Sequence, residues 1–222
     1  MSDLLISKRR ASVSGKTGSV VVLLHGYGAD GTDLLGLADP LAPHMPDTVF
    51  VAPDAPERCK NNPIGYQWFP IPWLDGSSPE AAEASQEVSA GKLDRFLDGV
   101  LEAEGVSPRD MVLFGFSQGT MMSLHVAPRR PEPVAGVVGF SGRLLAPERL
   151  AADTVSRPPV LLVHGDVDDI VPVASLGEAG DALTRNGFET YAHVMKGTAH
   201  GIAPDGLSVA LAFMREKLRI GN

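Results

Sequence analysis

The residues of this sequence that could perform covalent catalysis begin with a serine between two glycines. Ser117 lies in Gly115-Phe116-Ser117-Gln118-Gly119, which has the pattern G-x-S-x-G. In this pattern the serine sits on a sharp turn between a strand and a helix, and the glycines are needed because larger side chains would collide there. We therefore predict that Ser117 is a nucleophile. The alternative is that its hydroxyl only caps the following helix.

A serine hydroxyl needs a base to take its proton, and His200 is the histidine that best fits this role. It lies in Gly197-Thr198-Ala199-His200-Gly201, between the last predicted strand and the last predicted helix. The other histidines fit less well. His25 and His164 end earlier strands, His125 and His193 lie inside a helix and a strand, and His44 lies in a loop before Ser117. No two histidines have a metal-ligand spacing, so we expect no metal.

An acid that orients the histidine should follow a strand between Ser117 and His200, and three aspartates do so. Asp166, Asp168 and Asp169 come directly after an apolar run at 160–163. An EF-hand calcium loop is a rival interpretation. It fails because a loop starting at Asp166 would place valine where glycine is required and glycine where glutamate is required. Spacing alone leaves all three aspartates open, and two of them are expected to form turns or caps.

Two backbone N–H groups must stabilise the oxyanion that forms during such a reaction. One comes from the residue after the nucleophile, Gln118, and the other from a loop after an earlier strand. Residues 24–28, Leu-His-Gly-Tyr-Gly, form such a loop. The alternatives are an ordinary glycine-rich turn or half of a phosphate-binding loop, but the sequence has no G-x-x-x-x-G-K-[ST].

The elements that would position these residues alternate regularly between strand and helix. Buried strands are predicted at 19–24 and 48–52, further strands at 111–114, 134–140, 160–163 and 188–195, and helices at 30–41, 80–103, 118–126, 173–186 and 204–218. This order implies βαβ crossovers and a mainly parallel sheet with helices on both faces. Ligands of such sheets bind beyond the carboxyl ends of the strands, where the candidate residues lie.

The composition narrows the function further. A chain of 222 residues with 44% hydrophobic residues predicts one α/β domain over residues 1–222. The net charge of −8 argues against nucleic acid and anionic membranes as partners. The sequence shows no secretory signal and no apolar run long enough for stable membrane insertion. Its single cysteine, Cys59, fits a reducing compartment, so we expect a cytoplasmic protein.

Six segments together resemble the carboxylesterase/phospholipase family of α/β-hydrolases, which includes the acyl-protein thioesterases. They are LHGYGADGTDL (24–34), APDAP (52–56), GFSQG (115–119), FSG (140–142), HGDVDDIVP (164–172) and GTAHGI (197–202). The resemblance covers almost the whole chain. It implies the α/β-hydrolase fold, Asp168 as the acid, and oxyanion donors at the backbone of Tyr27 and Gln118, and it suggests a homodimer. The length of the chain leaves no room for a large separate lid domain, and the serine mechanism needs no metal or organic cofactor.

The acyl site is where this sequence departs from the family, which often has small residues after GFSQG. This chain has Thr120, Met121 and Met122 there, so we expect a reshaped pocket with Met121 in its wall. The irregular stretch 54–79 holds both tryptophans and flanks the predicted active site. Long irregular loops are usually functional, and we expect Trp68 and Phe69 to line the acyl site. The alternative is that these aromatics pack the loop onto the core.

These residues predict a serine carboxylesterase that hydrolyses short- to medium-chain carboxylic esters through an acyl-enzyme intermediate. The substrate is expected to be a small-molecule ester. Acyl(-protein) thioesters and lysophospholipids are alternative substrates, since the same groups would act on them. An alternative of a different class is a non-catalytic binding protein built on a hydrolase scaffold.

Overall fold

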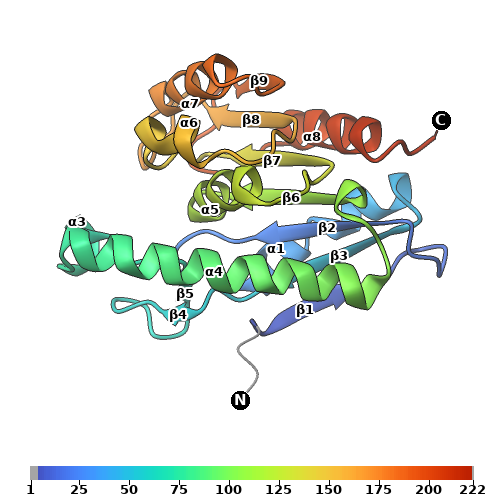
Figure 1. Ribbon diagram of the computed structural model, residues 1–222, viewed down its shortest axis with the longest axis horizontal. Coiled ribbons are helices and arrows are strands. Elements are labelled where there is room, and N and C mark those ends of the chain that lie inside the picture. The colour runs from blue at the N-terminus through green and yellow to red at the C-terminus, as the bar shows by residue number, and fades with distance from the viewer. Residues whose placement is uncertain (1–4, 222) are drawn as a thin grey trace.

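A seven-stranded sheet forms the centre of the computed structural model, which describes residues 5–221 (Figure 1). Residues 1–4 and residue 222 lie outside the described residues. The N-terminal segment in which a secretory signal would begin therefore lies partly outside this range. The strands are β1 (Ser7–Arg10), β2 (Ser19–Leu24), β3 (Thr48–Pro53), β6 (Met111–Phe116), β7 (Gly136–Phe140), β8 (Val160–Gly165) and β9 (Thr190–Met195). Their order is β1-β3-β2-β6-β7-β8-β9, and only the β1–β3 pairing is antiparallel. The prediction of a mainly parallel sheet is confirmed.

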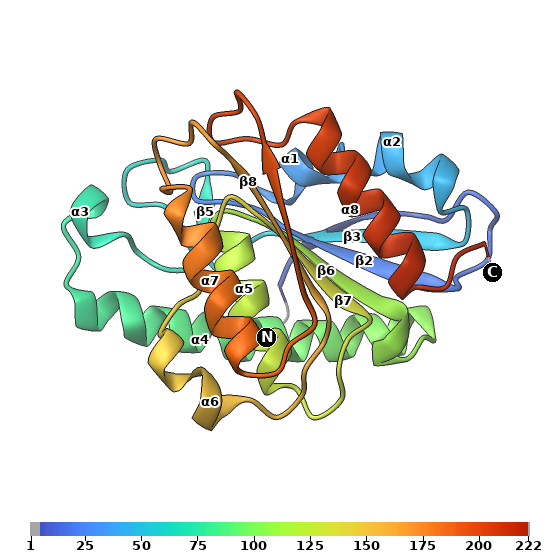
Figure 2. The ribbon, with the colours of Figure 1, turned by 90° about the horizontal axis from the view of Figure 1, so that it is seen from above.

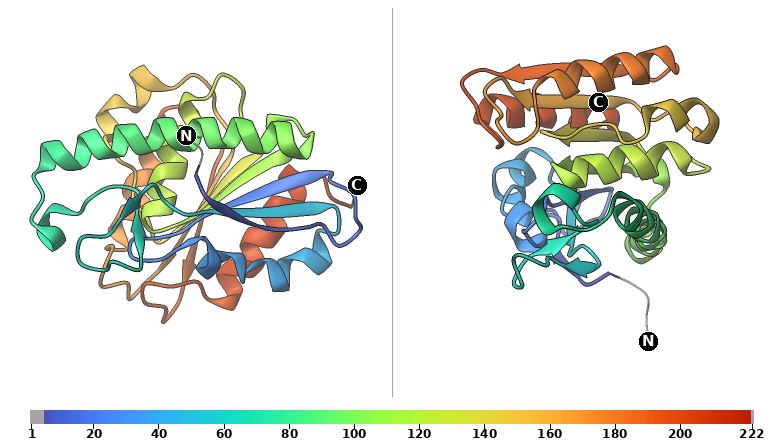
Figure 3. Two further views of the ribbon diagram at one scale, coloured as in Figure 1. Left: turned by 90° about the horizontal axis from the view of Figure 1, so that it is seen from below. Right: turned by 90° about the vertical axis from the view of Figure 1, so that its left-hand side faces the viewer.

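Helices cover both faces of this sheet, as predicted (Figures 2 and 3). One face packs against α4 (Pro79–Glu104), α5 (Gln118–Val126) and α7 (Ala174–Arg185), and the other against α1 (Gly31–Leu35), α2 (Ala38–Leu41) and α8 (Pro204–Lys217). The five inner strands β3, β2, β6, β7 and β8 are buried on both sides for this reason. In β2, for example, Val20 and Val22 belong to the first core and Val21 to the second, because successive side chains point to opposite faces.

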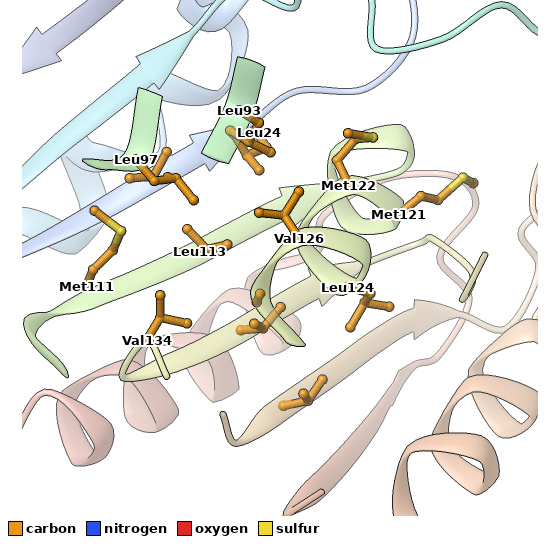
Figure 4. Close-up of a cluster of buried hydrophobic side chains, with 14 of the residues drawn as sticks. Leu24, Leu93, Leu97, Met111, Leu113, Met121, Met122, Leu124, Val126 and Val134 are labelled. Atoms are coloured by element: carbon orange, nitrogen blue, oxygen red, sulfur yellow. The ribbon is translucent and has the colours of Figure 1, made fainter. Parts of the chain in front are cut away.

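The core beneath α4 and α5 supports the turn that carries Ser117. Leu93 and Leu97 of α4 pack with Leu24 of β2 and Leu113 of β6, and all four side chains are fully buried (Figure 4). Burying a leucine side chain contributes about 1.5–3 kcal/mol relative to leaving it exposed. The strands on both sides of the predicted site are therefore held by the same apolar cluster.

Two elements differ from the sequence-based prediction. Strand β1 was not predicted, because its charged sequence Ser-Lys-Arg-Arg carries no apolar alternation. It lies at the edge of the sheet, where charged side chains are common because they discourage pairing with other chains. The single helix predicted at 30–41 is instead split into α1 and α2. Pro40 lacks the N–H that would continue a helical hydrogen-bond ladder from α1.

The stretch 54–79, predicted to be irregular, contains three short elements. Strands β4 (Glu57–Arg58) and β5 (Tyr66–Gln67) pair with each other, and α3 (Pro72–Asp75) follows. Tyr66 forms an isolated bridge with Ala29, which ties this stretch to the loop after β2. The stretch therefore packs against the loop after β2.

The connections of the sheet diverge between β2 and β6. From β2 the chain continues to β3 on one side, and from β6 it continues to β7 on the other. Because the two strands are parallel neighbours, their carboxyl ends lie together, and residues 24–28 and 115–119 meet there. Such a switch point is the usual ligand site of an open α/β sheet.

Candidate active site

Ser117 occupies a strained turn between β6 and α5. Its φ of 53° and ψ of −116° place it in the left-handed half of backbone space, which non-glycine residues rarely adopt. Its N–H donates to Phe140 O at 2.9 Å, and this bond fastens the turn to the neighbouring strand β7. Strain of this kind persists where the surrounding structure holds it, and it clusters at functional sites.

The two glycines of the G-x-S-x-G pattern are required by close packing around this turn. A side-chain carbon at Gly119 would lie 1.8 Å from Leu24 O, and one at Gly115 would lie 2.4 Å from Thr120 N. Neither position has room for another residue. The glycines thus bring the first turn of α5 against the end of β2, next to the predicted oxyanion loop.

Asp168 and His200 are joined by a short hydrogen bond. Nδ1 of His200 lies 2.8 Å from Oδ2 of Asp168, whose side chain is fully buried. An ionised carboxylate accepts hydrogen bonds only, so Nδ1 donates and Nε2 carries no proton in the neutral ring. This tautomer is the one a general base needs to accept a proton through Nε2.

The turn after β8 selects Asp168 from the three aspartates. Its Oδ1 accepts the N–H groups of Ile170 and Val171, each at 2.9 Å. Burial opposes ionisation of this carboxyl group, but the hydrogen bonds from His200 and from these two amides outweigh it and hold the pKa of Asp168 below its ordinary value. Asp168 is therefore an anion at neutral pH, suited to orient an imidazole.

His200 lies beside the residue that precedes Ser117. Its ring centroid is 4.9 Å from that of Phe116, at an interplanar angle of 49°. Among residues 5–221, no hydrogen bond joins Ser117 to His200. Catalytic hydrogen bonds of this kind are often long without substrate and tighten in the complex. The structure thus brings the three predicted triad residues to one edge of the sheet and directly links two of them.

The loops that carry Asp168 and His200 are also tied to each other. The carboxylate of Asp166 accepts the N–H of Gly197 at 2.7 Å, and the N–H of Val167 donates to Thr198 O at 3.2 Å. Asp166 therefore has a structural role, as expected for two of the three aspartates. Its position fixes the His200 loop relative to the end of β8.

His164 was predicted only to end a strand, but in the structure it contacts the predicted catalytic acid Asp168. Its ring is buried, and Nε2 lies 2.8 Å from Val171 O and 3.3 Å from Oδ2 of Asp168. The geometry indicates an Nε2–H that bonds Val171 and also faces the carboxylate. The signal for it was present in the sequence, as a histidine at the end of a strand four residues before Asp168.

The two predicted oxyanion donors lie on adjoining loops. A side-chain carbon at Gly26 would lie 3.2 Å from Ser117 Cβ, so the loop that carries Tyr27 adjoins the serine. Gln118 is the first residue of α5, where backbone N–H groups have no partner within the helix. No hydrogen bond from the Tyr27 amide is formed within the described part of the chain. Both amides are therefore available to an oxyanion.

His25 fixes the loop that carries Tyr27. Its Nδ1 is 2.7 Å from Gly26 O, and its Nε2 accepts the N–H of Ala55 at 2.9 Å, so the ring is neutral with its proton on Nδ1. Burial lowers the pKa of His25 and favours this neutral form. The histidine thus connects the oxyanion loop to the stretch that follows β3.

Trp68 lies behind the site and does not line it, so the prediction that it forms part of the acyl wall is wrong. Its side chain is fully buried, and the indole N–H donates to His25 O at 3.0 Å. Its backbone N–H donates to the side-chain oxygen of Gln118 at 3.1 Å, and the same side chain donates to Phe69 O at 2.8 Å. The alternative, in which this aromatic packs the loop onto the core, is the correct one for Trp68.

A cavity of about 600 Å³ opens at Ser117 and runs along α5. Its volume lies within the roughly 300–1,000 Å³ of small-molecule sites. Phe69 and Met121 line it, as predicted, together with Ser117 and Gln118. Several further lining residues come from separate loops and helices and were not predicted from the sequence: Trp73, His125, Arg143, Arg149 and Ile170.

His125 lines the cavity on the same face of α5 as Met121. It follows Ser117 by eight positions, about 12 Å along the helix axis. Burial lowers the pKa of His125, and the nearby positive charge of Arg129 acts in the same direction. The ring is therefore neutral at neutral pH, and Nδ1 lies 3.2 Å from the side-chain nitrogen of Gln86.

Residues 5–221 contain neither a helix able to span a membrane nor a cluster of metal ligands. No helix in this range combines the length and the apolar character that crossing a bilayer requires. The same residues contain no group of three or more histidine, cysteine, aspartate or glutamate side chains arranged to hold a metal ion.

Known proteins match this chain over nearly its whole length. The phospholipase/carboxylesterase family model matches residues 10–218. Acyl-protein thioesterase 1 of Saccharomyces cerevisiae is 27% identical, covering 89% of this chain and 92% of its own. Esterase YpfH of Escherichia coli is 25% identical over 88% of this chain and 82% of its own.

Solved structures agree with these matches. The crystal structure of esterase PE8 superposes with a TM-score of 0.92 at 46% identity, covering 97% of this chain and all of the other. The predicted α/β-hydrolase fold and the family resemblance are therefore confirmed. The chain belongs to the phospholipase/carboxylesterase family of hydrolases.

Proposed function

We propose that this protein is a serine carboxylesterase that hydrolyses short- to medium-chain carboxylic esters of small molecules in the cytoplasm. The single observation that carries the proposal is the arrangement at the carboxyl edge of the sheet. A strained serine follows β6, and an Asp168-bound histidine packs against the residue before it. The cavity that opens at this serine provides room for an acyl chain.

The reaction begins when His200 Nε2 accepts the hydroxyl proton of Ser117 and Ser117 Oγ attacks the ester carbonyl carbon. The tetrahedral oxyanion accepts hydrogen bonds from the N–H groups of Tyr27 and Gln118. When it collapses, the bond to the alcohol oxygen breaks and His200 donates its proton to that oxygen. The products of this half are the free alcohol and an acyl ester of Ser117.

Water completes the reaction by the same route. His200 removes a proton from water, the resulting hydroxide attacks the acyl carbon, and the acid leaves as the proton returns to Ser117. Asp168 stays ionised throughout, holding the tautomer of His200 and stabilising the imidazolium. The depressed pKa of Asp168 supports this role.

The volume and shape of the cavity support the proposed acyl size. Ser117, Met121 and His125 follow one face of α5, and an acyl chain attached to Ser117 would extend along that face. The roughly 12 Å from Ser117 to His125 sets the length of this path. Met121 lies between the two on this face and lines the cavity, so its side chain would contact an acyl chain that follows this path.

Thioesters are a second candidate substrate. The observation in their favour is that a relative of 27% identity over most of both chains is named an acyl-protein thioesterase. The same nucleophile, base and oxyanion donors would act on a thioester carbonyl. A comparison of matched oxygen esters and thioesters by kcat/KM would rank the two.

The test is steady-state hydrolysis of p-nitrophenyl esters from acetate to decanoate by wild type, Ser117→Ala and Ser123→Ala. Ser123 is a matched control because it lies on the same helix and donates to Gly119 O, away from the proposed chemistry. Ser117→Ala should lower kcat by about 10⁴-fold or more, while Ser123→Ala retains activity. Binding of an ester without turnover in the wild type would instead support a non-catalytic protein.

A further inference from the structure

The cavity at Ser117 contains two arginines, and only one of them is neutralised. Arg149 Nε lies 3.3 Å from Asp153, and Arg149 Nη1 lies 3.6 Å from Glu87. Arg143 also lines the cavity, but within residues 5–221 its guanidinium forms no hydrogen bond and no ion pair. An arginine is charged at every physiological pH, so this cation is available to a ligand.

Arg143 begins next to the reacting serine. A side-chain carbon at the preceding residue, Gly142, would lie 3.0 Å from Ser117 O and 2.5 Å from Thr120 Cβ. The backbone at 142 is thus in contact with the nucleophile turn. Arg143 and Ser117 line the same cavity, so one substrate can present its ester carbonyl to Ser117 and a second group to Arg143.

The loop that carries Arg143 is held in a strained conformation. Ser141 has a φ of 48° and Ala146 a φ of 44°, and only four non-glycine residues of the described chain have positive φ. Ser141 is fully buried, and its N–H donates to Val163 O at 2.9 Å, which fixes the start of the loop. Backbone strain persists where the surrounding structure holds it, so the backbone that carries the exposed Arg143 is held in place on both sides.

Arg143 could bind an anion only by direct contact, because most of the other charges of the cavity are negative. Three carboxylate side chains line the cavity: Glu83 and Glu87 on α4, and Glu178 on α7. With a net charge of −8, the protein repels an anionic substrate at long range. An anionic substrate would therefore depend on a direct pair with Arg143 rather than on electrostatic steering.

We propose that Arg143 is a specificity-determining residue that binds an anionic group of the substrate. The group is a carboxylate or a phosphate, whose oxygens match the two parallel N–H donors of a guanidinium. The preferred esters then carry a negative charge that reaches Arg143 while their carbonyl lies at Ser117 in the same cavity. This inference rests on the proposed esterase function.

The test compares esters that differ only in charge. On the acyl side, the pair is p-nitrophenyl hydrogen adipate and the p-nitrophenyl ester of adipamic acid, whose terminal amide is neutral and nearly isosteric. On the alcohol side, the pair is the butyrate ester of 4-hydroxybenzoate and that of 4-hydroxybenzamide. For each pair the measured quantity is the ratio of kcat/KM for the anionic ester to kcat/KM for the neutral ester.

Arg143→Gln should lower this ratio about tenfold or more in at least one pair, since a charge-assisted hydrogen bond is lost. The loss should come mainly from KM, and kcat/KM for the neutral ester should change little. Arg143→Glu should lower the ratio further. Arg149→Gln is the matched control, because it removes the same charge from the same cavity at a residue that is already paired. In this variant the ratio should stay within about twofold of the wild-type ratio.

Two results would overturn the proposal. One is a ratio that stays unchanged in Arg143→Gln for both pairs while neutral esters are still hydrolysed. The other is an equal fall in Arg143→Gln and Arg149→Gln, which would indicate a general charge effect. If wild type and Ser117→Ala were equally inactive on every ester, the esterase function itself would fail and this inference with it.

Discussion

Substitution of Trp68 separates a structural role from a substrate-binding role. Trp68→Phe keeps an aromatic ring in the core but removes the indole N–H that donates to His25 O at 3.0 Å. Leaving a buried carbonyl without this donor costs about 1–3 kcal/mol. Trp68→Ala also removes a fully buried ring, and such truncations cost about 3–5 kcal/mol.

The assay combines urea unfolding with the ester chain-length series. Both variants should lower the urea midpoint at unchanged m, with Trp68→Ala lowering it further. Neither should move the preferred acyl length, because Trp68 does not line the cavity. Lower kcat is expected in both, since the loop that carries Tyr27 loses an anchor at His25. A changed acyl preference at an unchanged urea midpoint would refute this reasoning.

Four further predictions follow from single contacts. Met121→Ala should move the preferred ester toward longer acyl chains, because Met121 lines the cavity, and an unchanged chain-length profile would contradict this. Gly119→Ala should destabilise the protein by about 3 kcal/mol in urea unfolding, because the added carbon would lie 1.8 Å from a backbone oxygen; a loss below about 1 kcal/mol would count against the packing described. The pKa of Asp168 is lower in the folded state than in the unfolded state. Ionised Asp168 therefore stabilises the fold above about pH 4, and this contribution is lost as the pH falls further. The free energies of unfolding of wild type and Asp168→Asn should therefore converge in acid, and parallel curves would argue against the shift. Because the folded-state pKa of His125 is lowered, stability should fall as pH drops below about 6.5, and His125→Gln should reduce that fall; identical pH dependences would contradict this.

The catalytic constellation could be predicted because its chemistry restricts residue type and position strongly. Gly115 and Gly119 stand where another residue would collide with backbone atoms, so their spacing around Ser117 is visible in the sequence. The choice of acid was different. Three aspartates follow the same strand, and only the folded structure, in which Asp168 bonds His200 and accepts two backbone amides, distinguishes it without reference to relatives.

The cavity could be predicted only in part, because its walls come from segments distant in the sequence. Trp68 and Phe69 are neighbours in the chain, yet one is buried against the oxyanion loop and the other lines the cavity. Adjacent residues of an irregular segment point in directions that tertiary contacts decide. Arg143 and Trp73 belong to no motif, and only the structure shows that they line the same cavity as Ser117.

The strands of the sheet could likewise be predicted only in part. The five inner strands could be predicted because burial on both faces requires continuous apolar runs, and the edge strand β9 was predicted as well although most of its residues are partly exposed. Strand β1 was missed, because its residues are charged and its partner β3 lies some forty positions later in the chain. Edge strands of this kind are specified by pairing rather than by local hydrophobicity.

The most direct test of the account is to trap the acyl-enzyme. Wild type, Ser117→Ala and Ser123→Ala would be mixed with p-nitrophenyl butyrate, quenched in acid within milliseconds and examined by intact-protein and peptide mass spectrometry. The account predicts a burst of p-nitrophenol and one butyryl group on the peptide that contains Ser117, in wild type and Ser123→Ala alone. Turnover by Ser117→Ala at the wild-type rate, or a butyryl group on another residue of an active enzyme, would contradict it.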